Sequence, residues 1–182
     1  MAKPDWLKKR FTYGKTMQNM LAILRSGRLH TVCEEACCPN CPDCFSRGTA
    51  TFLILGDRCT RDCRFCAVAH EAPLLPDHRE PGTVAEAVRN LGLRHAVITS
   101  VTRDDLPDGG AAHFAETIRS IRSESPDAVI EVLIPDFRGS EKALETVAAA
   151  EPNVIGHNLE TVPRPSTNTT TRYPRLKASS RT

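Results

Sequence analysis

Aromatic residues are scarce in this sequence, and charge of either sign is nearly balanced. Aromatics make up 5% of the 182 residues, and the formal net charge is +2. Nucleic-acid binding normally uses a concentrated basic face with interleaved aromatic side chains, so this composition argues against it. No apolar run is long enough to span a bilayer, and the basic segment 1–14 lacks the apolar centre of a signal peptide. We therefore expect a cytoplasmic protein that binds neither nucleic acid nor membrane.

Cysteine, by contrast, is abundant and strongly localised. All eight cysteines lie between Cys33 and Cys66, in two groups on either side of the apolar run 51–55. This run has the length and β-branched character of a buried strand. Thiols in a reducing cytosol are rarely paired as disulfides, so we expect metal ligands or redox groups here.

Strand and helix patterns alternate after the first cysteine group. With 40% hydrophobic residues, the chain is long enough for one globular domain with a core. The alternation predicts βαβ units and hence a parallel α/β sheet or partial barrel, with its chemistry at the carboxyl ends of the strands. Four such units cannot close an eight-unit barrel. The expected strands are 51–55, 96–100, 129–134 and 154–159.

Helix boundaries are predicted from capping residues. Gly27 is placed to end the first helix in a left-handed cap. Thr83, with Glu86 three residues later, has the spacing of a capping box that opens the next helix. A later helix begins near Ser140 and is expected to bury Leu144 and Val147.

Two alternative kinds of metal site are compatible with the cysteine spacing. Cys59, Cys63 and Cys66 form C-x3-C-x2-C, which would leave one iron of a 4Fe-4S cubane open to a small molecule. A zinc ribbon would instead pair the 41–44 and 63–66 C-x2-C spacings. The ribbon leaves other cysteines unused and spans the predicted strand. We interpret Cys37 and Cys41 either as small buried residues or as spare exposed thiols.

At this point the sequence resembles the lipoyl synthase family of radical S-adenosylmethionine (SAM) enzymes. The resemblance runs from about Lys3 to Arg164 and includes CEEACCPNCPDCFSRGTATF, CTRDCRFC, VTRDDLPDGGA, EVLIPDFRG and HNLETVPR. It implies an N-terminal helical and loop extension, 1–50, that carries an auxiliary iron-sulfur motif. A partial radical SAM (β/α) barrel, 51–162, follows. We expect the atypical tail, 163–182, to be disordered.

The resemblance also implies two 4Fe-4S clusters. The family's auxiliary ligands fall on Cys33, Cys38 and Cys44, and its radical SAM cluster ligands fall on Cys59, Cys63 and Cys66. Cys37 and Cys41 stand where the family uses no cysteine ligand. No catalytic residue is assigned beyond the cluster ligands. From their positions in the motifs and near strand ends, the candidate contacts to SAM are Phe65, Ser100, Arg103, Glu131, Asn158 and Glu160.

The implied activity is that of a sulfurtransferase. In this family a radical derived from SAM abstracts hydrogen at C6 and C8 of a protein-bound octanoyl group, and the auxiliary cluster donates two sulfur atoms to form the lipoyl cofactor. The implied partners are octanoylated lipoyl-carrier domains or H protein, and an electron donor such as a flavodoxin or ferredoxin.

The sequence departs from this family after Arg164. Family members continue with further βα units and an Arg-Ser-Ser-Tyr motif whose serine completes the auxiliary cluster. Here Ser179 and Ser180 stand in a different context, ASSRT, and are not assigned as ligands. We hypothesise that truncation or a frameshift replaced the remainder. An inactive chain, a zinc-binding interaction module and a non-catalytic iron-sulfur remnant therefore stay open as alternatives.

Overall fold

The computed structural model describes residues 15–35, 38 and 40–159. Glu160, Cys37, the predicted tail 163–182 and its serines lie outside this part of the chain. Within the described ranges, no helix is long and apolar enough to cross a bilayer. The elements in chain order are α1 (Lys15–Ser26), β1 (His30–Thr31), α2 (Val32–Glu35), α3 (Cys41–Ser46), β2 (Thr49–Ile54), α4 (Glu80–Asn90), β3 (His95–Ser100), α5 (Ala111–Glu124), β4 (Val129–Leu133), η2 (Phe137–Gly139), α6 (Glu141–Ala148) and β5 (Val154–Gly156).

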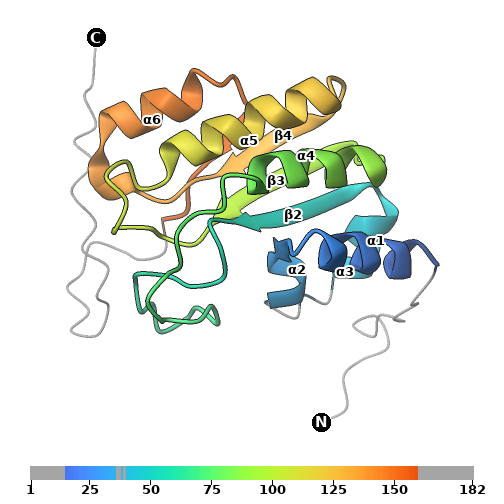
Figure 1. Ribbon diagram of the computed structural model, residues 1–182, viewed down its shortest axis with the longest axis horizontal. Coiled ribbons are helices and arrows are strands. Elements are labelled where there is room, and N and C mark those ends of the chain that lie inside the picture. Colours follow the sequence, from blue (N-terminus) through green and yellow to red (C-terminus); the bar gives the residue numbers. More distant parts are fainter. Residues whose placement is uncertain (1–14, 36–37, 39, 160–182) are drawn as a thin grey trace.

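A five-stranded sheet forms the centre of the fold, in the order β1-β2-β3-β4-β5 (Figure 1). β1 runs antiparallel to β2, and all later neighbours are parallel. This confirms the predicted α/β class and the partial barrel. The expected strands are all present, but β5 ends at Gly156 and not at Leu159. The alternation of β-rich runs and helices was thus sufficient to predict the parallel strands. The loop 56–79 between β2 and α4, which carries Cys59, Cys63 and Cys66, is called the cysteine loop below.

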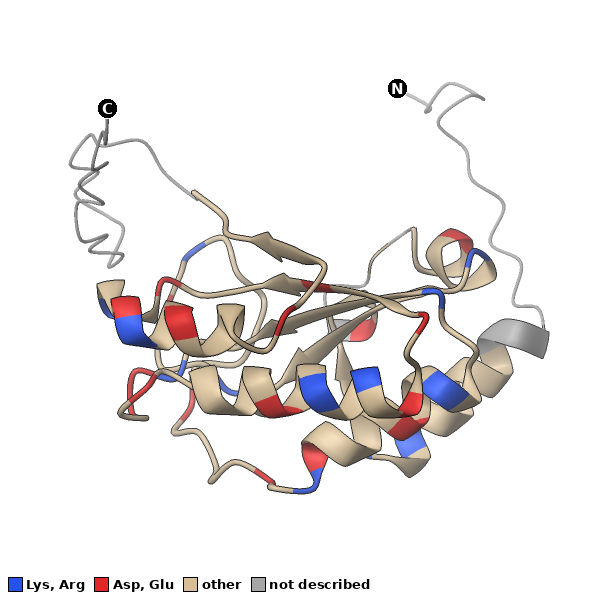
Figure 2. Cartoon of the chain, turned by 90° about the horizontal axis from the view of Figure 1, so that it is seen from above, with Lys and Arg blue, Asp and Glu red and all other residues tan. Residues whose placement is uncertain are grey.

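The two faces of the sheet differ in their covering. Helices α4, α5 and α6 lie along one face (Figure 1), and Figure 2 shows acidic and basic residues interspersed along them. Strand residues on the opposite face, such as Thr51, Val97 and Glu131, are only half-buried. The helix-covered side is therefore the main core. Its strand residues, all 0% exposed, are Ala50, Phe52, Ile54, Ala96, Ile98, Ile130 and Val132.

Two predictions of helix boundaries were wrong. Gly27 follows α1 without a left-handed backbone, which Arg28 adopts instead (φ 51°). α4 begins at Glu80, three residues before the predicted cap, because a proline at its first turn already has a helical φ. The Thr83 hydroxyl donates to the Arg79 carbonyl inside the helix (3.1 Å).

The predicted burial of Leu144 was also wrong, because this side chain is 45% exposed. Ala143 and Val147, four residues apart, form the buried stripe of α6 and turn Leu144 outward. The predicted start of this helix is confirmed, since the Ser140 hydroxyl accepts from the amide of Ala143 (3.2 Å).

The end of β2 is held by charged side chains. Leu55 has a left-handed backbone (φ 68°). Its amide donates to the Glu80 carboxylate (2.8 Å), and its carbonyl accepts from Arg103 (3.2 Å). Gly110, also left-handed (φ 92°), packs so closely that an added Cβ would lie 2.3 Å from Leu55 Cδ1. This junction fixes the direction in which the cysteine loop leaves the sheet.

We expect Gly110→Ala to destabilise the fold. The new Cβ meets Leu55 and the left-handed backbone disfavours a side chain, so the free energy of unfolding should fall by about 1–3 kcal/mol. Gly82→Ala in α4 is the control, since its Cβ meets nothing within 4 Å and should leave stability unchanged or raise it by about 0.5–1 kcal/mol. Urea unfolding followed by circular dichroism measures both, and equal midpoints would contradict the assignment.

Candidate cluster and cofactor site

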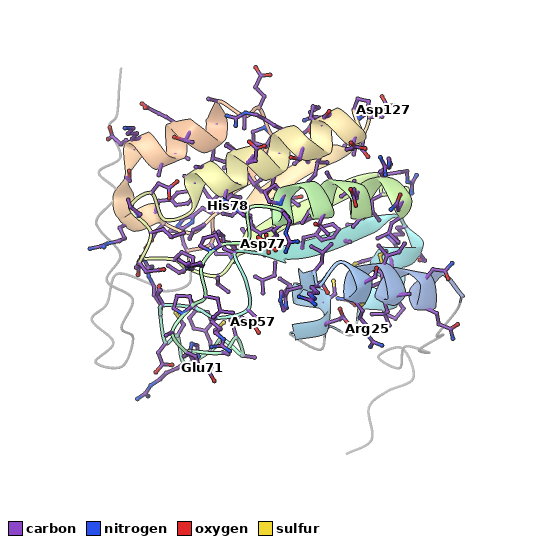
Figure 3. All side chains as sticks on the ribbon, in the orientation of Figure 1. Arg25, Asp57, Glu71, Asp77, His78 and Asp127 are labelled. Carbon is purple, nitrogen blue, oxygen red and sulfur yellow. The ribbon has the colours of Figure 1, made fainter. Side chains whose placement is uncertain are left out.

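A pocket of about 210 Å³ lies where the parallel strands end, on the less covered face of the sheet. β2, β3 and β4 contribute Leu53, Thr99 and Leu133, which share this face because side chains alternate along a strand. The loop after β2 completes the wall (Figure 3, where Asp57 and Glu71 are labelled on this loop). The loops after Ser100, after Ile134 and at Asn158 therefore meet at this pocket.

The loop from β2 to α4 brings three thiols to this pocket. Cys59, Cys63 and Cys66 are half-buried, and all three line the cavity. The amide of Cys66 donates to the carbonyl of Cys63 (2.9 Å), and the amide of Cys59 donates to that of Ala69 (2.9 Å). The amide of Arg61 lies 3.4 Å from Cys59 Sγ and donates to it. Hydrogen bonds to the cysteine sulfurs are one of the ways in which a protein tunes an iron-sulfur cluster.

These residues fit a cubane cluster with one open iron. Three thiols line a single pocket. In a cubane each thiolate binds a separate iron, so three thiolates leave the fourth iron open. A single metal ion would need at least three ligands close together. The described residues contain no group of three or more His, Cys, Asp or Glu side chains that could hold such an ion. At the same pocket, Ser100 Oγ is buried and has no hydrogen-bond partner among the residues that the structure describes. Buried hydroxyls are normally paired, so this atom suits a polar ligand.

The structure gives the zinc ribbon no support. Cys41 and Cys44 lie on α3, which packs with α1 and against β2, whereas Cys63 and Cys66 line the pocket. A four-cysteine zinc site needs all four sulfurs around one ion. In the described part of the chain, these two pairs form no such group.

The upstream cysteines form a second neighbourhood. Backbone hydrogen bonds link them, since the amide of Cys38 donates to the carbonyl of Cys33 (3.1 Å) and that of Cys41 to Cys38 (3.2 Å). Burial raises the pKa of the Cys33 thiol, and the nearby Cys38 and Cys44 raise it further. Burial, followed by the charge of Cys33, raises the pKa of Cys41 to about 12.

Cys41 is only 5% exposed, so the interpretation of this residue as a small buried one agrees with its environment. The other interpreted thiol, Cys37, lies outside the described residues. Assignment of Cys33, Cys38 and Cys44 as auxiliary ligands stays a prediction.

The candidate SAM contacts fall into two groups. Phe65, Ser100 and Asn158 line the pocket. Arg103 is 1% exposed and is turned toward the end of β2, where its guanidinium also binds Asp105 through two hydrogen bonds of 2.8 Å. Glu131 is half-buried and lies 2.9 Å from His95 Nε2, toward the amino end of β3. Arg103 and Glu131 thus stand apart from the residues that line the cavity.

Sequence reasoning missed Arg61 as a site residue. Arg61 and Asp136 both line the pocket, and Arg61 pairs with Asp104 and Asp136 together. The hydrogen bonds that Arg61 donates to Asp104, and then those to Asp136, raise the pKa of Arg61. Burial alone would raise the pKa of Asp136, but hydrogen bonds from Arg61 and the amide of Arg138 leave it below its ordinary value. The available signal was a basic residue between two predicted ligands, Cys59 and Cys63, together with aspartates after two of the strands.

Comparison with known proteins agrees with this geometry. Residues 53–178 match the family model described as radical SAM superfamily. A lipoyl synthase of Chlorobaculum parvum is 56% identical over 162 residues, which cover 88% of this chain and 56% of that protein. Lipoyl synthases of Nitrosomonas eutropha and Caldicellulosiruptor bescii are also 56% identical, each over 90% of this chain and over 52% and 56% of their own lengths.

The predicted resemblance to lipoyl synthases is therefore confirmed. The chain spans about half the length of the curated relatives it matches. The family match covers the end of β2, strands β3 to β5, the pocket and the C-x3-C-x2-C loop, and this chain belongs to the radical SAM superfamily.

Proposed function

We propose that this chain is a lipoyl synthase that binds a 4Fe-4S cluster at Cys59, Cys63 and Cys66 and SAM in the adjoining pocket. The observation that carries the proposal is the convergence of these three half-buried thiols on one cavity at the carboxyl ends of parallel strands. The similarity to relatives named lipoyl synthase supports the assignment of this particular activity within the superfamily. A carbon radical must be kept away from water, and a pocket at the carboxyl ends of the strands provides such a shielded position.

The residues of the pocket have separate roles in this proposal. When bound, the cluster supplies the electron that cleaves the sulfonium of SAM. Ser100 offers a hydroxyl to a polar group of SAM, and Asn158 offers an amide from the loop after β5. Leu53 and Leu133 line the same cavity with apolar surface and keep water from the reacting centre.

The upstream cysteines complete the proposed reaction. Cys33, Cys38 and Cys44 would hold the auxiliary cluster, which supplies sulfur for insertion at C6 and C8 of an octanoyl chain. The substrate is then an octanoylated lipoyl-carrier domain or H protein, with a flavodoxin or ferredoxin as electron donor. The spacing of these cysteines supports this assignment, as does their placement, with Cys33 on α2, Cys44 on α3 and Cys38 hydrogen-bonded to Cys33.

Anaerobic reconstitution with iron and sulfide tests the cluster sites. We expect a brown protein with visible absorption, and Cys63→Ser should lose the iron of one cubane because an open cluster has no spare protein ligand. Cys41→Ala, which keeps a small buried residue, should retain the full iron content. Iron and sulfide analysis measures the difference. A colourless protein that carries one tightly bound zinc would refute the proposal.

Reductive cleavage of SAM tests catalysis. Reconstituted protein with dithionite should form 5′-deoxyadenosine, and an octanoylated acceptor should increase its yield and gain sulfur. Liquid chromatography with mass spectrometry quantifies both products. Cluster loading without any 5′-deoxyadenosine would instead identify a non-catalytic iron-sulfur remnant.

Ser100→Ala should weaken SAM binding without affecting folding. Loss of one hydrogen bond of about 1 kcal/mol would raise the SAM concentration for half-maximal cleavage roughly fivefold. Ser140→Ala is the matched control, because this serine caps α6 and its loss should cost about 1 kcal/mol of stability without changing SAM binding. Equal SAM dependence of Ser100→Ala and wild type would remove Ser100 from the site.

A further inference from the structure

Arg61 lies between the first two thiols of the cysteine loop and joins two other loops. Its Nε and Nη2 donate to the two oxygens of Asp104, at 2.7 and 2.9 Å. Its Nη1 and Nη2 donate to the two oxygens of Asp136, both at 2.8 Å. Asp104 follows β3 and Asp136 follows β4, so one guanidinium connects the cysteine loop to the ends of two strands.

The arrangement is largely shielded from water. The side chains of Arg61 and Asp136 are 19% and 7% exposed, and that of Asp104 is 30% exposed. Bidentate pairs with a carboxylate have a fixed orientation, which a lysine ammonium cannot reproduce. Removal of the arginine would leave carboxylates with little access to water, which is strongly unfavourable.

Adjacent backbone and hydroxyl contacts hold the same point of the loop. The Thr60 amide and hydroxyl both donate to the carbonyl of Thr102, at 3.1 and 2.9 Å. The Thr60 hydroxyl in turn accepts from the amide of Asp104 (3.0 Å). Side-chain and backbone contacts therefore converge on two consecutive residues between Cys59 and Cys63.

We propose that Arg61 is a positioning residue, which fixes the three thiols at the strand ends and neutralises acidic groups beside them. The hydrogen bonds of its guanidinium go to Asp104 and Asp136, and it acts through these two carboxylates. Without it, two unpaired carboxylates would flank the cluster and disfavour an added electron. This inference rests on the proposed function for its effect on the cluster, and on geometry alone for its effect on the loop.

Hydrogen exchange of the cluster-free chain tests the positioning directly. Arg61→Gln and Arg61→Lys should speed amide exchange at Cys59 and Thr60 at least severalfold, because the loop loses its bidentate attachment. Arg89→Gln is the matched control, since it breaks an exposed arginine–carboxylate pair between α4 and α5. Unchanged exchange in both Arg61 variants would overturn the proposal. Arg61→Lys keeps the positive charge and serves if Arg61→Gln does not fold.

Iron titration and redox potentiometry test the consequence for the cluster. Arg61→Gln should raise the iron concentration for half-loading by roughly 10- to 100-fold and make the reduction potential more negative, whereas Arg61→Lys should shift the potential less. Potentials equal to wild type would overturn the electrostatic part. A wild-type chain that binds no iron refutes the proposed function, while the exchange measurement still decides the role of Arg61.

Discussion

The hydrogen bonds at Leu55 are the constraint on which the site depends. At this residue the chain leaves the core and starts the cysteine loop, in a backbone conformation that leucine rarely adopts (φ 68°). Glu80 accepts from its amide and also lies 2.6 Å from His113 Nε2 on α5. Buried Arg103 donates to its carbonyl. Two helices and the loop after β3 thus hold one turn, which sets the path of every thiol that follows.

The periodicity of apolar residues predicted the fold because the strands bury every second residue and the helices bury residues three or four positions apart. The strand runs and the buried face of α5 follow from this patterning alone. Boundaries were harder to predict, because they depend on competition between local signals. Pro81 starts α4 before the capping box at Thr83 can act, and the buried stripe of α6 settles on Ala143 and Val147 instead of Leu144.

The position of Cys59, Cys63 and Cys66 at the sheet end was predictable from sequence, whereas the surroundings of these thiols were only partly so. Spacing places three thiols on one short loop, and a strand before them puts that loop at the end of the sheet. Side-chain direction is not fixed by sequence position. Arg103 therefore lies near a strand end yet turns into the protein toward Leu55, and Arg61 became recognisable only when the fold brought two distant aspartates to it.

The cysteine loop has little hydrophobic packing of its own. From 56 to 79 no residue is buried, and Phe65, Leu74 and Leu75 are 61%, 69% and 92% exposed. A segment without a buried apolar side chain depends on hydrogen bonds and ion pairs for its conformation, and these exchange with water more easily than a packed core does. The charged contacts at Leu55 and Arg61 therefore determine the position of the thiols, and cluster binding would add its own free energy to an otherwise weakly held loop.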